Sequence, residues 1–145
     1  MKTAKEIFET VKKHLMAQGM PSMDENETCM YRGDNGTKCA VGCLITDEAY
    51  TPSIEEISVD RVRISPAGTW EPGEAREHHG DNYDMLARAL TKSGIPATQE
   101  VYRTLKALQV LHDTVDAKGW AAEFDKAELV LFGDDNHSPP IITSN

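Results

Sequence analysis

Apolar and charged positions at the start of the chain recur with the period of an α-helix. Four apolar residues share one helix face: Ile7, Phe8, Val11 and Leu15. Thr3 and Glu6 have the spacing of a capping box, in which each side chain bonds a backbone N–H of the other residue. Gly19 follows the last apolar position, where a helix commonly ends. The pattern predicts an amphipathic helix between Thr3 and Gly19.

Three further helices are predicted in the second half of the chain. The first covers residues 84–93 and ends at Gly94. The second begins after Thr98 and is the longest, because its apolar stripe is unbroken: Val101, Leu105, Leu108, Leu111 and Val115. The third begins at Trp120 and finishes before Gly133.

The last residues, 134–145, contain two consecutive prolines and no periodic pattern. Chain ends of this kind are commonly disordered. We therefore expect one domain over residues 1–133, followed by a flexible C-terminal tail over 134–145.

Strand patterns lie between the helices. Asn35-Gly36 provides the left-handed backbone of a tight turn, and strand-forming segments at 30–32 and 38–43 flank it, which predicts a β-hairpin. Small residues such as Gly42 in the second arm indicate that another element, most simply a helix, packs closely against it. Residues 57–64 alternate towards their end and predict a third strand. Residues 65–82 are predicted to form a long loop.

Together these elements predict an α+β fold. A small antiparallel sheet, made of the hairpin and the third strand, packs against about four α-helices.

Composition and charge narrow the function classes. The 145 residues carry 24 acidic and 15 basic side chains, a formal net charge of −9. A surface this acidic repels phosphate backbones, so we expect no general binding of nucleic acids. The apolar runs are shorter than the roughly 20 residues of a membrane helix. The three cysteines do not form the pattern of a secreted disulfide framework, so we expect a cytoplasmic protein without membrane contact.

The cysteines are also candidates for metal binding or catalysis. Cys29, Cys39 and Cys43 could bind zinc if a histidine completed the site, and the candidates for that ligand are His78, His79 and His112. A Cys–His pair could also serve a hydrolase. Free cysteines are more often small buried hydrophobic residues, so that interpretation is favoured over both. We expect no resident cofactor.

A second candidate site is built from cations. Arg32 and Lys38 flank the predicted turn, while Arg61 and Arg63 share a face of the predicted third strand. If these strands are neighbours, the four cations and Tyr31 line one surface. Arginine matches phosphate oxygens and a tyrosine ring stacks on a base, so the surface would suit a nucleotide. The alternative, which we favour, is that the charges solvate an exposed sheet.

One stretch resembles a family of small bacteriophage and prophage proteins. It reads Cys-x-Tyr-Arg, a glycine-rich turn, then Lys-Cys-Ala-Val-Gly-Cys-Leu-Ile and Asp-Glu-x-Tyr-x-Pro, over residues 29–52. The resemblance extends to the helix before it and to the segment 105–113, but not to residues 57–83. The family has no known activity that could be transferred to individual residues.

The resemblance implies an accessory protein that acts by binding inside the host cell. Its expected role is to counter a bacterial defence system, either by inhibiting a host defence protein or by sequestering a nucleotide second messenger. The negative charge suits a protein target with a basic surface, whereas Tyr31 and the four cations suit the nucleotide. A hydrolase dependent on Cys/His or a metal, and a virion assembly protein, are the alternatives. A homo-oligomer is compatible with each.

Overall fold

The computed structural model describes residues 3–73 and 84–136. Helix α1 (Ala4–Gln18) begins and ends as the sequence predicts. The Thr3 side chain accepts a hydrogen bond from the Glu6 backbone N–H, and the Glu6 carboxylate accepts one from the Thr3 N–H. Gly19 ends the helix with a φ of 71°. The four predicted apolar residues are buried, so the amphipathic interpretation is confirmed.

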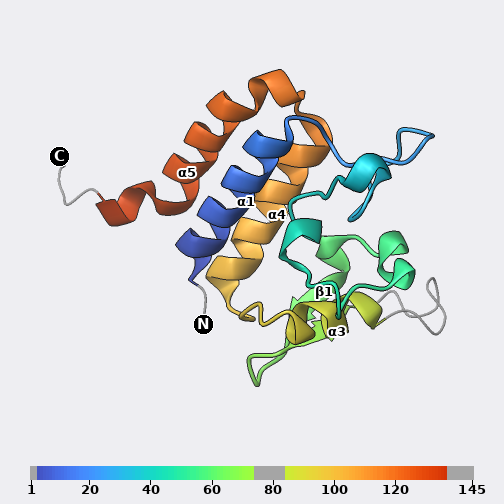
Figure 1. The fold of residues 1–145 in the computed structure, drawn as a ribbon. Helices are drawn as coiled ribbons and strands as arrows, with labels where there is room; N and C mark the ends of the chain where they lie inside the picture. The colour runs from blue at the N-terminus through green and yellow to red at the C-terminus, as the bar shows by residue number, and fades with distance from the viewer. Residues whose placement is uncertain (1–2, 74–83, 137–145) are drawn as a thin grey trace.

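Helices α1, α4 (Gln99–Thr114) and α5 (Trp120–Asn136) lie side by side and form the main helical layer (Figure 1). Phe8 of α1 is in edge-to-face contact with Phe124 and Phe132 of α5, with ring centroids 6.0 and 5.5 Å apart. Thr98 caps α4 as predicted. The predicted end of the last helix is wrong: α5 continues through Gly133 to Asn136, because one glycine near a helix end costs only about 1 kcal/mol.

The sheet is smaller than predicted and is made of different segments. Strand β1 (Val62–Ile64) coincides with the end of the predicted third strand. It pairs in antiparallel register with β2 (Trp70–Pro72), which lies in the segment that the sequence assigns to a loop. The Trp70 indole donates a hydrogen bond to the Ile95 carbonyl oxygen, and α3 (Met85–Lys92) packs against β2. Burial of that indole explains why a strand forms in a sequence without periodicity.

The predicted hairpin at residues 30–43 is wrong in its second arm. Asn35 and Gly36 do have positive φ angles, 62° and 74°, so the turn is confirmed. A single isolated bridge joins Arg32 and Lys38, and the chain then turns into a 3₁₀ helix at Gly42–Leu44. Alanine and glycine are poor strand formers, which favours the turn. Close packing at Gly42 is confirmed, but its neighbour is the backbone of Tyr31 and not a helix.

The molecule therefore belongs to the α+β class, as predicted, with four α-helices and one two-stranded antiparallel sheet among the described residues. None of these helices is long and apolar enough to cross a membrane. The candidate ligands His78 and His79 lie outside the described residues, and so does the predicted tail from residue 137 onward.

Candidate functional site

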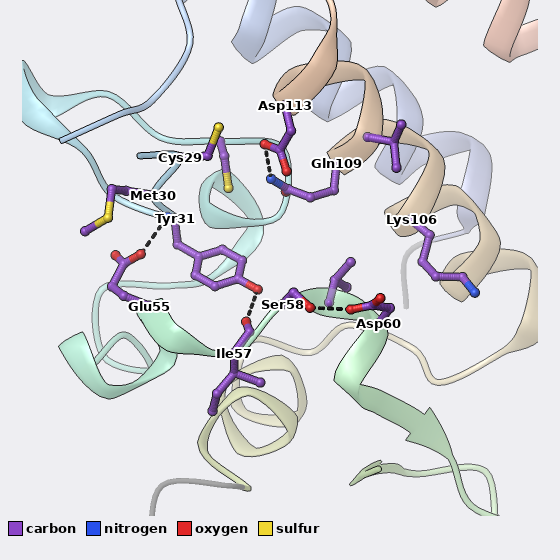
Figure 2. Close-up of a pocket in the computed structure, with 13 residues that line it drawn as sticks. Cys29, Met30, Tyr31, Glu55, Ile57, Ser58, Asp60, Lys106, Gln109 and Asp113 are labelled. Carbon is purple, nitrogen blue, oxygen red and sulfur yellow. Dashed lines mark hydrogen bonds between the residues drawn. The ribbon is translucent and has the colours of Figure 1, made fainter. Parts of the chain in front are cut away.

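A pocket of about 510 Å³ opens between α4 and two segments of the irregular layer, residues 29–31 and 55–60 (Figure 2). Helix α4 contributes one wall, with Lys106, Gln109, Val110 and Asp113. Two 3₁₀ helices, Pro52–Glu56 and Val59–Arg61, position the residues of the opposite side. The pocket is thus assembled from segments that are far apart in the sequence.

Tyr31 forms a fixed wall of the pocket. Its side chain is buried, and its hydroxyl donates a hydrogen bond to the Ile57 carbonyl oxygen (Figure 2). Burial raises the pKa of the Tyr31 phenol well above its ordinary range. The ring is therefore neutral and held in place, and its hydroxyl is already committed to a backbone partner.

Glu55 connects three parts of the site. One carboxylate oxygen accepts a hydrogen bond of 2.8 Å from the Tyr31 backbone N–H. The other accepts bonds from the Arg32 backbone N–H, at 3.1 Å, and from the Tyr50 hydroxyl, at 2.7 Å. Burial, followed by the hydrogen bond to Glu55, raises the pKa of the Tyr50 hydroxyl to about 12. Both oxygens of Glu55 thus hold the pocket wall together.

Cys29, His112 and Asp113 meet at one end of the pocket, with one potential ligand atom of each within 4.8 Å of the others. The Ser22 backbone N–H donates to His112 Nε2 over 2.8 Å, so Nε2 carries a lone pair and no proton. The ring proton is then on Nδ1, which lies 2.8 Å from Asp113 Oδ1 and donates to it. This is the neutral tautomer of a buried structural histidine.

This arrangement does not activate the Cys29 thiol. Burial raises its pKa to about 11, and the neighbouring charge of Asp113 and a hydrogen bond to that carboxylate act in the same direction. A nucleophilic cysteine needs the opposite, a lowered pKa and a base that can accept its proton. Neither ring nitrogen of His112 is available, since one accepts from Ser22 and the other carries the proton.

The same tautomer argues against a metal at this position. A metal bound at Nδ1 would need the lone pair of that nitrogen, so the ring proton would have to move to Nε2. A proton on Nε2 would then point at the Ser22 N–H, which is itself a donor. The other two cysteines make local bonds: Cys39 Sγ accepts from the Gly42 N–H at 3.3 Å, and Cys43 Sγ donates to the Ala40 carbonyl at 3.2 Å. No close ligand group that includes Cys39 or Cys43 is found within residues 3–73 and 84–136.

Arg32, the first of the predicted cations, is engaged inside the protein. Its Nη2 donates to the Ile45 carbonyl and to Asp47 Oδ1, both at 2.9 Å, and the guanidinium lies 4.4 Å from the centre of the Tyr50 ring. Its Nε is buried and has no hydrogen-bond partner among the described residues. The guanidinium is thus held by a carbonyl, a carboxylate and an aromatic ring, and the Arg32 side chain is only 21% exposed.

The remaining predicted cations do not join Tyr31 in one surface. Arg61 ends the 3₁₀ helix Val59–Arg61 and Arg63 lies on β1, and both are exposed. Arg63 Nε pairs with Glu71 of β2 over 2.6 Å. Because β1 pairs with β2, it is not the neighbour of the Arg32–Lys38 bridge that the hypothesis required. Tyr31 lines the pocket, whereas the four cations do not. A role of these residues in binding phosphate stays a prediction.

Sequence reasoning missed the carboxylates of the pocket. Glu55 and Asp60 lie on 3₁₀ helices, which have no periodic pattern to detect. Asp60 is exposed and accepts a hydrogen bond from the Ser58 hydroxyl (Figure 2). With Asp113 they give the pocket three carboxylates, against the single ammonium group of Lys106. This excess of negative charge favours a cationic ligand over a phosphate.

A scan against models of protein families found no match for this chain, and neither did searches of curated proteins and of solved structures.

Proposed function

We propose that this protein acts by binding a basic segment of another protein at the pocket beside α4. The observation that carries the proposal is the composition of the pocket: Glu55, Asp60 and Asp113 surround a space of about 510 Å³, large enough for one long cationic side chain. The Tyr31 ring and the sulfur atoms of Met30 and Cys29 offer apolar contact to the stem of that side chain.

The overall charge supports the same kind of partner. A net charge of −9 attracts a basic protein surface and raises the rate of encounter. For a nucleotide, both the overall field and the pocket are repulsive, and Arg32 and Arg63 are already paired with carboxylates. Sequestration of a nucleotide signal is therefore the weaker of the two binding functions.

The state of Cys29 supports binding over catalysis. Its raised pKa keeps the thiol protonated, and neither ring nitrogen of His112 can accept its proton. The role that fits a small acidic binding protein with the resemblance described above is that of a phage-type accessory protein, which inhibits a basic defence protein of the bacterial host.

The first experiment compares two probes by isothermal titration calorimetry, an oligo-arginine peptide and a cyclic dinucleotide. We expect the peptide to bind, with an affinity that falls as salt is raised. Asp60→Asn should weaken peptide binding about threefold or more, because it removes a charge beside the bound cation. Asp125→Asn is the matched control, since Asp125 is exposed on α5 and does not line this pocket.

An equal loss of affinity in both variants would show that the field of the whole chain, and not the pocket, attracts the peptide. Binding of the dinucleotide alone would replace this proposal with the nucleotide one. The biological role is tested separately, by phage plaque formation on bacteria that carry individual defence systems. Expression of the wild type should restore plaques against one system and Asp60→Asn should not; no restoration against any system would contradict the role.

A further inference from the structure

Helix α5 carries apolar side chains on two faces. Trp120, Phe124 and Phe132 are buried against the rest of the molecule. Leu129 and Val130 point away from that core and are 66% and 83% exposed. A surface helix ordinarily has one apolar stripe and one polar face. The second stripe of α5 is therefore not explained by the packing of the described chain.

The exposed apolar surface continues onto α4. Val110 is 59% exposed, and a groove of about 300 Å³ runs between the two helices. Its floor and edges are mostly small or aliphatic, including Ala107, Val110, Ala127, Val130 and Leu131. The two helices are joined by the short connection 115–119 and form a helical hairpin. Such hairpins commonly pack face to face in helical bundles.

The charges at the groove suit a second copy of this chain. Glu123 and Lys126 border it and form an ion pair of 3.4 Å, so this pair adds no net charge to the face. The whole chain carries a net charge of −9, so the acidic parts of its surface repel a second copy. A two-fold interface places the same patch of each copy against the other, which requires a patch that is complementary to itself. A patch with one positive and one negative charge meets this condition.

We infer that the α4/α5 face, defined by Val110, Val130 and the Glu123–Lys126 pair, binds a second copy of this chain. The contact is apolar at its centre, and the charged pair lies at the groove. Because both copies are strongly acidic elsewhere, they repel at low ionic strength. Salt screens that repulsion, so the dimer strengthens as salt is raised. This is the opposite of the salt dependence expected for binding of a basic partner.

The test is sedimentation velocity of the full chain over a range of protein and salt concentrations. We expect a monomer–dimer equilibrium that shifts towards dimer at higher salt. Val130→Asp should raise the dissociation constant about tenfold or more, since it places a like charge at the centre of both halves. Met20→Asp is the matched control: Met20 is 49% exposed and lies beyond the end of α1, and this change should leave the equilibrium unaltered.

Two results would overturn the inference. One is a wild type that stays monomeric at every concentration. In that case the double variant Ile141→Asp/Ile142→Asp is measured next. If this variant forms a dimer, the C-terminal residues of the same chain are the occupant of the face in the wild type. The other is a dimer that survives Val130→Asp while circular dichroism shows an intact fold. Oligo-arginine binding, measured at concentrations where the chain is monomeric, should not change in Val130→Asp, so the two proposals can fail independently.

Discussion

Substituting Gly42 by alanine should be among the most damaging single-methyl changes in this protein. A Cβ at Gly42 would lie 1.9 Å from the carbonyl oxygen of Tyr31 and 2.7 Å from its carbonyl carbon. The obstacle is backbone, which cannot rotate away as a side chain can. Gly42 does not have a positive φ, so the requirement for glycine here is space and not backbone conformation.

The expected loss of stability in Gly42→Ala follows from the hydrogen bonds that hold Tyr31 in place. Its N–H is bonded to Glu55, its hydroxyl to Ile57, and its carbonyl oxygen accepts a bond of 3.2 Å from the Cys39 N–H. Moving the backbone at Tyr31 aside adds the cost of overpacking, about 1–3 kcal/mol, to about 1 kcal/mol for the lost Cys39 bond. We expect a loss of about 3 kcal/mol in the free energy of unfolding, a large share of the 5–15 kcal/mol typical of domains.

Urea unfolding followed by circular dichroism measures this loss. Gly133→Ala is the control, because its Cβ would lie 3.6 Å from Leu129 Cδ2, an ordinary contact, within α5. Alanine in a helix stabilises by up to about 1 kcal/mol relative to glycine, so the control should equal or exceed the wild type. A Gly42→Ala protein within about 0.5 kcal/mol of the wild type would refute the packing described for residues 31–42.

Three further predictions concern individual side chains. Arg32→Ala should cost about 1–2 kcal/mol and lower Tm by several degrees, while Arg61→Ala should leave Tm unchanged, since only Arg32 is engaged within the protein; equal melting of the two variants would contradict this. Burial raises the pKa of Cys29 to about 11 and of Cys39 to about 12, from an ordinary 9.0. Their contribution is complete below pH 9 and is lost as pH rises from 9 through about 11 for Cys29 and about 12 for Cys39, because the unfolded chain releases these protons first, so Tm should fall over that interval; a Cys29→Ser/Cys39→Ser protein with the same decline would show another cause. His112→Leu should cost about 1–3 kcal/mol in urea unfolding, since it leaves a buried backbone N–H without an acceptor, and a neutral result would contradict the assigned tautomer.

The helices could be predicted because their signals are local. The capping box at Thr3, the stop at Gly19 and the cap at Thr98 each depend on residues within one turn. The end of α5 was predicted too early, because packing of Phe132 against Phe8 outweighs the weak helix-breaking tendency of Gly133. Local propensity fails to predict the structure wherever a contact with a distant residue contributes more to the free energy of folding.

The strands and the pocket depend on such distant contacts. Asn35-Gly36 predicts its own backbone conformation correctly, yet nothing near it in the sequence specifies that residues 40–43 coil into a turn against Tyr31 and do not extend as a strand. The bond from Tyr31 to Glu55 spans 24 residues, and that from Ser22 to His112 spans 90. His112 is recognisable at the edge of an apolar stripe, but the partner that fixes its tautomer is not.

The two proposed surfaces meet on α4, where Val110 lines both the acidic pocket and the groove beside α5. They are therefore coupled through electrostatics even if no residue moves. A basic segment bound at Glu55, Asp60 and Asp113 neutralises part of the charge that keeps two copies apart. Binding of the basic partner should then favour the dimer at low ionic strength, and by linkage the dimer should favour the partner equally. Since the coupling arises from unscreened charge, it decreases as salt is added, while the apolar contact itself persists.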